Sequence, residues 1–154
     1  MRPWHVRKAG AETSDAELLA LLRAAFAYMD GRIDPPSSLV RMDRAEIAAK
    51  RAEEDVLVVR EGGRLVACAF LATHPDHHYL GKLAVHPDRQ GTGLGRALVE
   101  AAIARATRPE IRLQTRVELV ENHAAFARLG FVETGRTTHP GYDRPTSVSM
   151  ALRL

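Results

Sequence analysis

A glycine-rich loop between a strand-like segment and a helix-like segment constrains this chain more than any other feature. Residues 80–87 (LGKLAVHP) have the apolar character of a strand, and the loop 90–95 (QGTGLG) follows them. Apolar residues then recur at helical spacing, which predicts a helix over residues 94–105. The first amides of a helix lack partners within it and lie at the positive end of its dipole. Strand, glycine loop and helix in this order therefore predict a phosphate-binding site.

Two well-known phosphate loops do not fit these residues. A Walker loop ends in Gly-Lys-Ser/Thr, whereas here Gly95 is followed by Arg96 and Ala97. A dinucleotide fingerprint needs a third glycine where this chain has Arg96 or Leu98. The following strand, which should then end in an acidic residue, ends near Arg116.

Composition narrows the class of protein. With 154 residues, 45% apolar and 27% charged, the chain has the make-up of one soluble domain, and it has no apolar run long enough to span a membrane. Residues 1–8 lack the apolar core of a secretion signal, and Cys68 is the single cysteine, so the cytoplasm is the expected compartment. The net charge of +3 is spread along the chain, which argues against a nucleic-acid module. No metal is expected.

The hydrophobic periodicity predicts one mixed α/β sheet covered by helices. A capping box at residues 14–17 marks the start of the first helix, and glycines 62 and 63 form a hairpin turn. Helices are predicted up to residue 29 from that box and over 39–52, 94–105 and 122–129, and strands over 4–8, 55–60, 64–71, 78–85, 111–117, 131–137 and 147–154.

The loop resembles the acyl-CoA motif of the GNAT superfamily of N-acetyltransferases. Gln90, Gly93 and Gly95 stand in its spacing, and residues 122–131 (NHAAFARLGF) are similar to the family's second cofactor segment. The resemblance implies a single domain over residues 1–154, with a central mixed, mostly antiparallel sheet of about seven strands flanked by about four helices. It also implies an enzyme that moves an acetyl or short acyl group from CoA to an amine, directly within a ternary complex.

The same resemblance implies which residues bind acetyl-CoA. The backbone of Leu83, Ala84 and Val85 would hydrogen-bond the pantetheine arm, and an amide of this strand would polarise the thioester carbonyl. Asn122 would contact the pantetheine end of the site. The pyrophosphate would lie on the amides of Gln90, Gly91, Thr92, Gly93, Leu94, Gly95 and Arg96.

Three side chains that the family often uses for catalysis are absent. Tyr79 and Gln114 stand where the family places a glutamate, and Phe126 stands where a tyrosine usually protonates the thiolate. Amine acylation still needs a group to remove a proton and a donor for the departing sulfur. The candidates to replace them are His78, with His74 and His77 beside it, as base, and Tyr142, or else His139, as proton donor.

These absences leave open a second function, that of an acyl-CoA-binding sensor or a catalytically retired domain. For an enzyme, the acceptor is expected between the loops 30–38 and 138–146, which prolines stiffen. An acceptor ammonium would favour Asp34 or Asp143, and an acceptor carboxylate would favour Arg32 or Arg144. The residues do not identify the acceptor, which could be a small molecule or a peptide, and a homodimer is also open.

Overall fold

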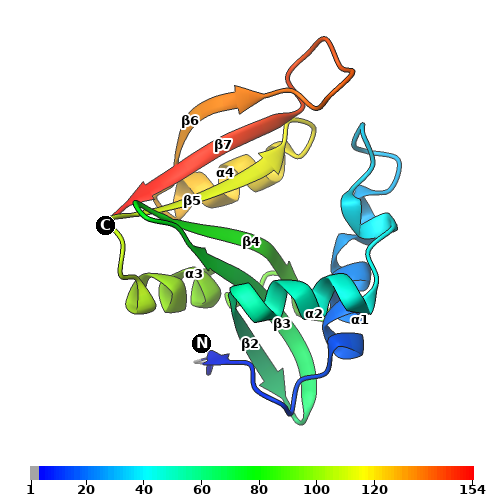
Figure 1. Ribbon diagram of the computed structural model, residues 1–154, viewed down its shortest axis with the longest axis vertical. Coiled ribbons are helices and arrows are strands. Elements are labelled where there is room, and N and C mark those ends of the chain that lie inside the picture. Colours follow the sequence, from blue (N-terminus) through cyan, green and yellow to red (C-terminus); the bar gives the residue numbers. More distant parts are fainter. Residues whose placement is uncertain (1–3) are drawn as a thin grey trace.

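The computed structural model describes residues 4–154, so Met1–Pro3 of the stretch considered above as a secretion signal lie outside it (Figure 1). The described strands form one sheet in the order β1-β2-β3-β4-β5-β7-β6, antiparallel at every pairing except that of β4 with β5. The strands are β1 (Arg7–Lys8), β2 (Asp55–Glu61), β3 (Arg64–Thr73), β4 (His78–Val85), β5 (Glu110–Arg116), β6 (Val132–Thr137) and β7 (Ser147–Arg153). The helices are α1 (Asp15–Phe26), α2 (Arg44–Glu53), α3 (Leu94–Arg105) and α4 (Val120–Arg128), with single 3-10 turns at Ala27–Met29, Ser38–Val40 and Pro87–Arg89.

The predicted order of elements is confirmed, and two elements begin well after their predicted first residue, whereas most other bounds differ by no more than two residues. The helix expected over residues 39–52 begins at Arg44, because the Asp43 side chain accepts from the Glu46 amide at 3.0 Å and caps it there. The strand expected over residues 4–8 is reduced to Arg7–Lys8. Trp4 instead reaches the glycine loop, where its indole N–H donates to the Thr92 carbonyl at 2.9 Å.

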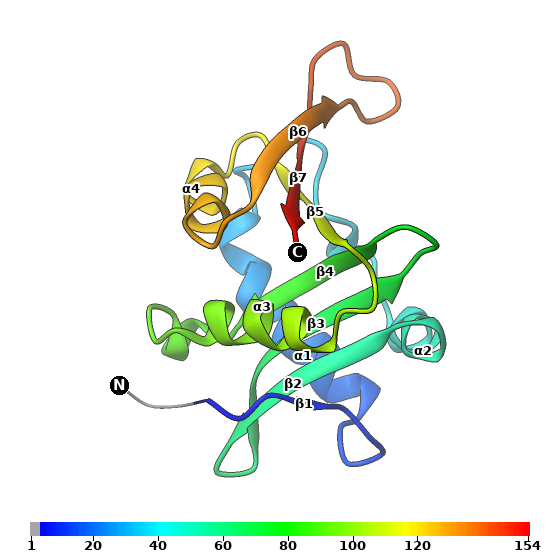
Figure 2. The same ribbon diagram turned by 90° about the vertical axis from the view of Figure 1, so that its left-hand side faces the viewer.

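Helices cover both faces of the part of the sheet formed by β2, β3 and β4, with α1 and α2 on one face and α3 on the other, so β2 and β3 are apolar on both sides (Figures 1 and 2). Alternate residues of β2 point to opposite faces. Val56 and Val58 belong to the core beneath α1 and α2, whereas Leu57 and Val59 belong to the core beneath α3. Phe126 of α4 packs against that second core. Within residues 4–154, no helix has both the length and the apolar character needed to cross a bilayer.

The sheet opens between its two middle strands. β4 pairs with β5 at two positions, His78 with Ile111 and Tyr79 with Arg112. Beyond Tyr79 the two strands diverge, which is visible as the gap between the upper and lower halves of the sheet in Figure 1. Backbone groups of β4 that a neighbouring strand would otherwise occupy therefore face this opening.

A bulge in β4 lies at the same place. Cys68 of β3 pairs with Ala84, but Phe70 pairs with Gly81, so Lys82 and the residue after it oppose a single residue of β3. Lys82 has φ of 49°, the left-handed region that a lysine rarely adopts. The bulge rotates the backbone of β4 where the strands part.

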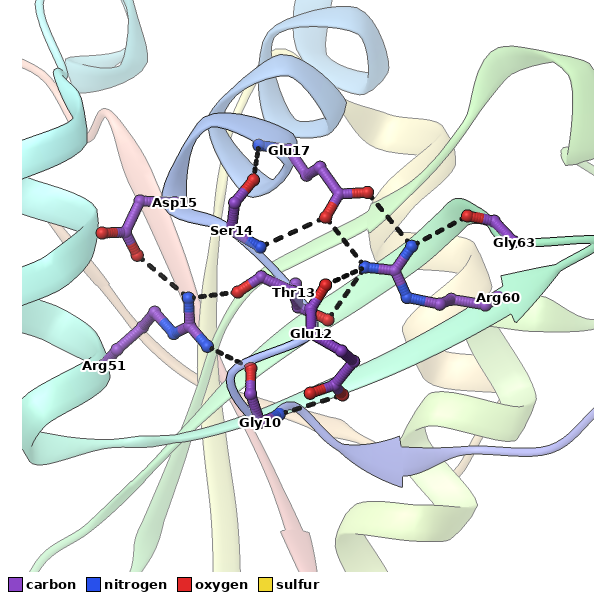
Figure 3. Close-up of polar contacts among 9 residues, drawn as sticks. All are labelled: Gly10, Glu12, Thr13, Ser14, Asp15, Glu17, Arg51, Arg60 and Gly63. Carbon is purple, nitrogen blue, oxygen red and sulfur yellow. Dashed lines mark hydrogen bonds and ion pairs between the residues drawn. The ribbon is translucent and has the colours of Figure 1, made fainter.

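Two arginines fix the start of α1 to its neighbours (Figure 3). From β2, Arg60 donates to both carboxylate oxygens of Glu17 at 2.9 and 3.0 Å and to the Thr13 hydroxyl at 3.0 Å. From α2, Arg51 donates to the Thr13 carbonyl at 2.7 Å and pairs with Asp15 at 3.0 Å. Glu17 also completes the predicted capping box with its N-cap serine. These contacts anchor α1, whose far end leads into the loop that borders the candidate site.

Candidate active site

The glycine loop borders a cavity of about 470 Å³, called here the glycine-loop cavity. Gly93 is the N-cap of α3 and has φ of 87°, a conformation that favours glycine and exposes the first amides of the helix. Predicted cofactor residues that line this cavity are Leu83, Val85, Gln90, Gly91, Gly93, Leu94, Gly95 and Asn122.

The other three predicted cofactor residues do not line the glycine-loop cavity. Ala84 is 1% exposed and belongs to the core beneath α1. Thr92 is exposed, and its carbonyl accepts from Trp4. Arg96 is exposed on the first turn of α3. The contacts predicted for Ala84, Thr92 and Arg96 are all made by backbone groups, and the Arg96 side chain is exposed to solvent.

A second cavity, of about 540 Å³, lies where β4 and β5 diverge and is called here the central cavity. Its walls come from the end of α1, the loop that follows it, the two strands and the loop between β6 and β7. Phe26, Leu83 and Asn122 line both cavities. The two cavities therefore meet beside the bulge of β4.

The loops 30–38 and 138–146 meet beside the central cavity. The Tyr142 hydroxyl donates to Asp34 at 2.6 Å, and Arg144 pairs with the same carboxylate at 3.3 Å. The hydrogen bond to Asp34 raises the pKa of Tyr142, because it holds the phenolic proton in place. Behind this contact, Arg116 donates to the Pro35 carbonyl at 2.6 Å, and its partial burial lowers the pKa of the guanidinium.

Most of the charged side chains expected to bind an acceptor are already paired within the protein. Asp34 binds Tyr142 and Arg144, and Arg32 pairs with Glu121 at 2.8 Å. The remaining one, Asp143, is exposed. These residues hold the loops together, which leaves other groups to contact an acceptor.

His78 is deeply enclosed, at 2% exposed, and lines neither cavity. Its Nε2 accepts from the Thr107 backbone amide at 2.9 Å, and its Nδ1 lies 3.1 Å from the Thr73 hydroxyl. With both ring nitrogens bonded, the side chain ties the start of β4 to the segment after α3.

Tyr28, which the sequence indicates for the acceptor pocket rather than for catalysis, is a further site residue. It lines the glycine-loop cavity, and its hydroxyl accepts from the Asn122 side-chain amide at 3.2 Å. Since Asn122 occupies a lone pair of the hydroxyl, the phenolic hydrogen can be directed elsewhere. No local pattern marks this residue for catalysis, because its partner lies 94 positions away.

Three ionisable side chains of β3 and β4 lie in or near the bulge and are at least partly buried. Burial raises the pKa of the Cys68 thiol to about 12, so the thiol is protonated and unsuited to nucleophilic attack. Burial also raises the pKa of Tyr79 and lowers the pKa of Lys82. Within residues 4–154, no three His, Cys, Asp or Glu side chains are grouped to hold a metal ion.

Comparison with known proteins agrees with this architecture. A family model described as "Acetyltransferase (GNAT) family" matches residues 17–131. A mycothiol acetyltransferase of Nocardia farcinica (strain IFM 10152) is 36% identical over 130 residues, covering 82% of this chain, which spans 39% of that relative's length.

Solved structures of similar fold include a GCN5-related N-acetyltransferase from Rhodopseudomonas palustris, with a TM-score of 0.76 and 24% identity over 100% of this chain and 98% of that one. A GNAT family acetyltransferase from Elizabethkingia anophelis with acetyl-CoA bound has a TM-score of 0.70 and 14% identity, covering 97% of each chain.

Proposed function

Since the chain belongs to the acetyltransferase (GNAT) family, we propose that it transfers an acetyl or similar short acyl group from acetyl-CoA to an amine. The observation that carries this proposal is the meeting of two cavities beside the bulge of β4. One is bordered by the glycine loop and the other by the two loops expected to receive an acceptor. Such an arrangement suits a donor and an acceptor that react while both are bound.

In this proposal acetyl-CoA binds along the opened edge of β4. Its pyrophosphate lies against the backbone amides of residues 90–96, where the dipole of α3 favours negative charge. Its pantetheine arm follows Leu83 and Val85 into the junction of the cavities. The acetyl-CoA-bound Elizabethkingia structure, which shares the fold, supports this class of ligand.

The reaction is a direct attack of the neutral amine nitrogen on the thioester carbonyl. A C–N bond forms, the C–S bond breaks, the amine gives up a proton, and the CoA thiolate accepts one. Proximity within the joined cavities supplies part of the rate, and backbone amides at the β4 bulge stabilise the developing oxyanion. The buried thiol of Cys68 takes no part.

Tyr28 is the proton donor to the thiolate in this proposal. Its hydroxyl lies beside Asn122 at the junction of the cavities, whereas the Tyr142 hydroxyl is engaged by Asp34. A phenol whose proton is held by a carboxylate is a poorer donor, so Tyr142 closes the loops over the acceptor instead. His78 keeps a structural role because both ring nitrogens are bonded.

The second candidate function is that of an acyl-CoA sensor, favoured by the Tyr79, Gln114 and Phe126 side chains at positions that often carry catalytic groups. A turnover assay separates the two. The protein is incubated with acetyl-CoA and a panel of amines, CoA thiol release is followed optically, and products are identified by mass. Acetylated amine supports the enzyme. Calorimetric binding of acetyl-CoA with no product from any amine supports the sensor.

A further inference from the structure

The Lys, Arg, Asp and Glu residues that line the central cavity are all cationic ones. None of its lining residues within the described part of the chain is an aspartate or a glutamate, whereas Arg41, Lys82 and Arg116 all line it. An ammonium group would therefore find no carboxylate on these walls. An anionic group would find three cationic residues.

Two carboxylates next to the loops that border the cavity, those of Asp34 and Glu118, already have partners within the protein. Asp34 accepts from Tyr142 and Arg144. One oxygen of Glu118 accepts from the Asp34 amide at 3.1 Å, and the other is buried without a hydrogen bond. Asp34 and Glu118 thus hold the loops together, and neither of them lines the cavity.

Arg41 differs from the other two cations. The guanidinium of Arg116 donates to the carbonyls of Pro35 and Pro36, and burial lowers the pKa of Lys82. Arg41 follows the 3-10 turn of Ser38–Val40 and is exposed, and among the described residues its side chain has no hydrogen bond or ion pair. A planar guanidinium with free donors matches a carboxylate in a two-point contact.

The rest of the cavity is apolar in large part. Side chains from the end of α1, from the loop after it, from β5 and from α4 with its N-cap supply this surface, which suits a hydrocarbon body rather than a sugar or a polyamine. They are Phe26, Met29, Ile33, Leu39, Leu113, Leu119 and Phe126.

We propose that the acceptor is a primary amine that also carries a carboxylate, bound by Arg41, with an apolar body against the central cavity. This inference rests on the proposed function and names its substrate class. The amine nitrogen points to the junction at Leu83, while the carboxylate lies toward the rim where Arg41 stands.

Matched ligand pairs test this directly. Apolar amino acids are compared with the amines of the same skeleton that lack the carboxylate, such as phenylalanine with phenethylamine and ω-amino acids with alkylamines of equal length. Two readouts are taken, namely kcat/KM for acetylation and calorimetric binding of the N-acetylated compounds to the CoA-loaded protein. We expect the carboxylate to improve both by at least about tenfold.

Three variants test whether Arg41 causes the preference for a carboxylate. Arg41→Gln should remove the preference for the carboxylate, and Arg41→Lys should restore part of it, because lysine keeps the charge without the planar fork. Arg105→Gln is the matched control, since Arg105 is an exposed arginine at the end of α3 on the opposite face of the sheet. It should leave the preference unchanged.

The possible results distinguish a failure of this inference from a failure of the proposed acetyltransferase function. Equal binding of amino acids and amines, or a preference that survives in Arg41→Gln, overturns the inference even when amines are acetylated. A carboxylate preference in the binding measurement that disappears in Arg41→Gln supports the inference even when no acceptor turns over. In that second case it is the proposed function that fails.

Discussion

Gly93 and Gly95 are glycines for different physical reasons. Gly93 has φ of 87°, so any side chain there would strain the backbone whatever space surrounds it. Gly95 has no such constraint, and a Cβ added to it would meet Leu83 Cδ2 at 4.0 Å, an ordinary contact. A substitution at Gly95 therefore tests access of a ligand to the loop rather than the conformation of the loop.

We predict that Gly95→Val weakens acetyl-CoA binding at least about tenfold while the protein still unfolds cooperatively, because its branches occupy the space that the pyrophosphate must enter. Calorimetric titration measures the affinity. Gly135→Val is the control, since Gly135 lies on β6 with open space around it and outside both cavities. Unchanged affinity in a folded Gly95→Val protein would contradict the placement of the pyrophosphate.

Replacing Tyr28 and replacing Tyr142 by phenylalanine should change different kinetic parameters. Tyr28→Phe is expected to lower kcat by about a hundredfold, the scale of a lost proton donor, with little change in acceptor KM. Tyr142→Phe is expected to raise acceptor KM instead, because it releases the contact with Asp34. The pH dependence of kcat in each variant provides a second readout. If Tyr28→Phe retains wild-type kcat, another group protonates the thiolate.

At the scale of single elements, the local sequence pattern predicted where helices and strands lie better than it predicted bulges and caps. The bounds of β4 and α3 agree with the sequence prediction, because apolar periodicity and the glycine loop define them. The bulge at Lys82 could not be predicted, since it arises from the register between β3 and β4 and places a lysine where a glycine would be expected. The late start of α2 follows from one cap, Asp43.

The ion pair between Arg60 and Glu17 at the start of α1 should make the stability of the protein depend on pH. The hydrogen bonds from Arg60 lower the pKa of Glu17, so the folded value lies below the unfolded value of about 4.3. Stability from this pair is present above the unfolded pKa and is lost as the pH falls through the folded pKa.

Glu17→Gln should therefore lower Tm by about 2–4 °C at pH 7, and its difference from the wild type should shrink as the pH falls below about 4. Glutamine can still complete the capping box, so the change isolates the ion pair. Calorimetric melting across pH provides the measurement, with Glu100→Gln, at an exposed position of α3, as control. A constant difference at all pH values would mean that the pair does not couple to folding.

For the molecule as a whole, the sequence predicted which loops would lie opposite β4, the strand expected to bind the cofactor. It did not predict which residues of those loops contact each other. The loops 30–38 and 138–146 do border the central cavity. Their contact depends on Asp34 and Tyr142, which are 108 positions apart, and such pairings leave no local signal. The same limit explains why Arg32 and Arg144 appeared free in the sequence and are paired in the fold.

Transfer within joined cavities predicts that no acetyl group rests on the protein. After incubation with acetyl-CoA alone, intact mass spectrometry should show the unmodified chain, and Cys68→Ala should keep its turnover because the wild-type thiol is buried and protonated. Initial-velocity lines for the two substrates should intersect. An acetylated protein together with parallel lines would indicate a covalent intermediate instead.

The contact between Trp4 and the glycine loop gives the protein an optical probe of its own. Trp4 is the single tryptophan of the chain, and its indole N–H donates to the Thr92 carbonyl. Any ligand that reorients the loop changes the polarity and hydrogen bonding around that indole. Emission excited in the indole band should therefore follow occupancy of the loop in real time, without label or coupling enzyme, and distinguish a bound phosphate from a ligand held only in the central cavity.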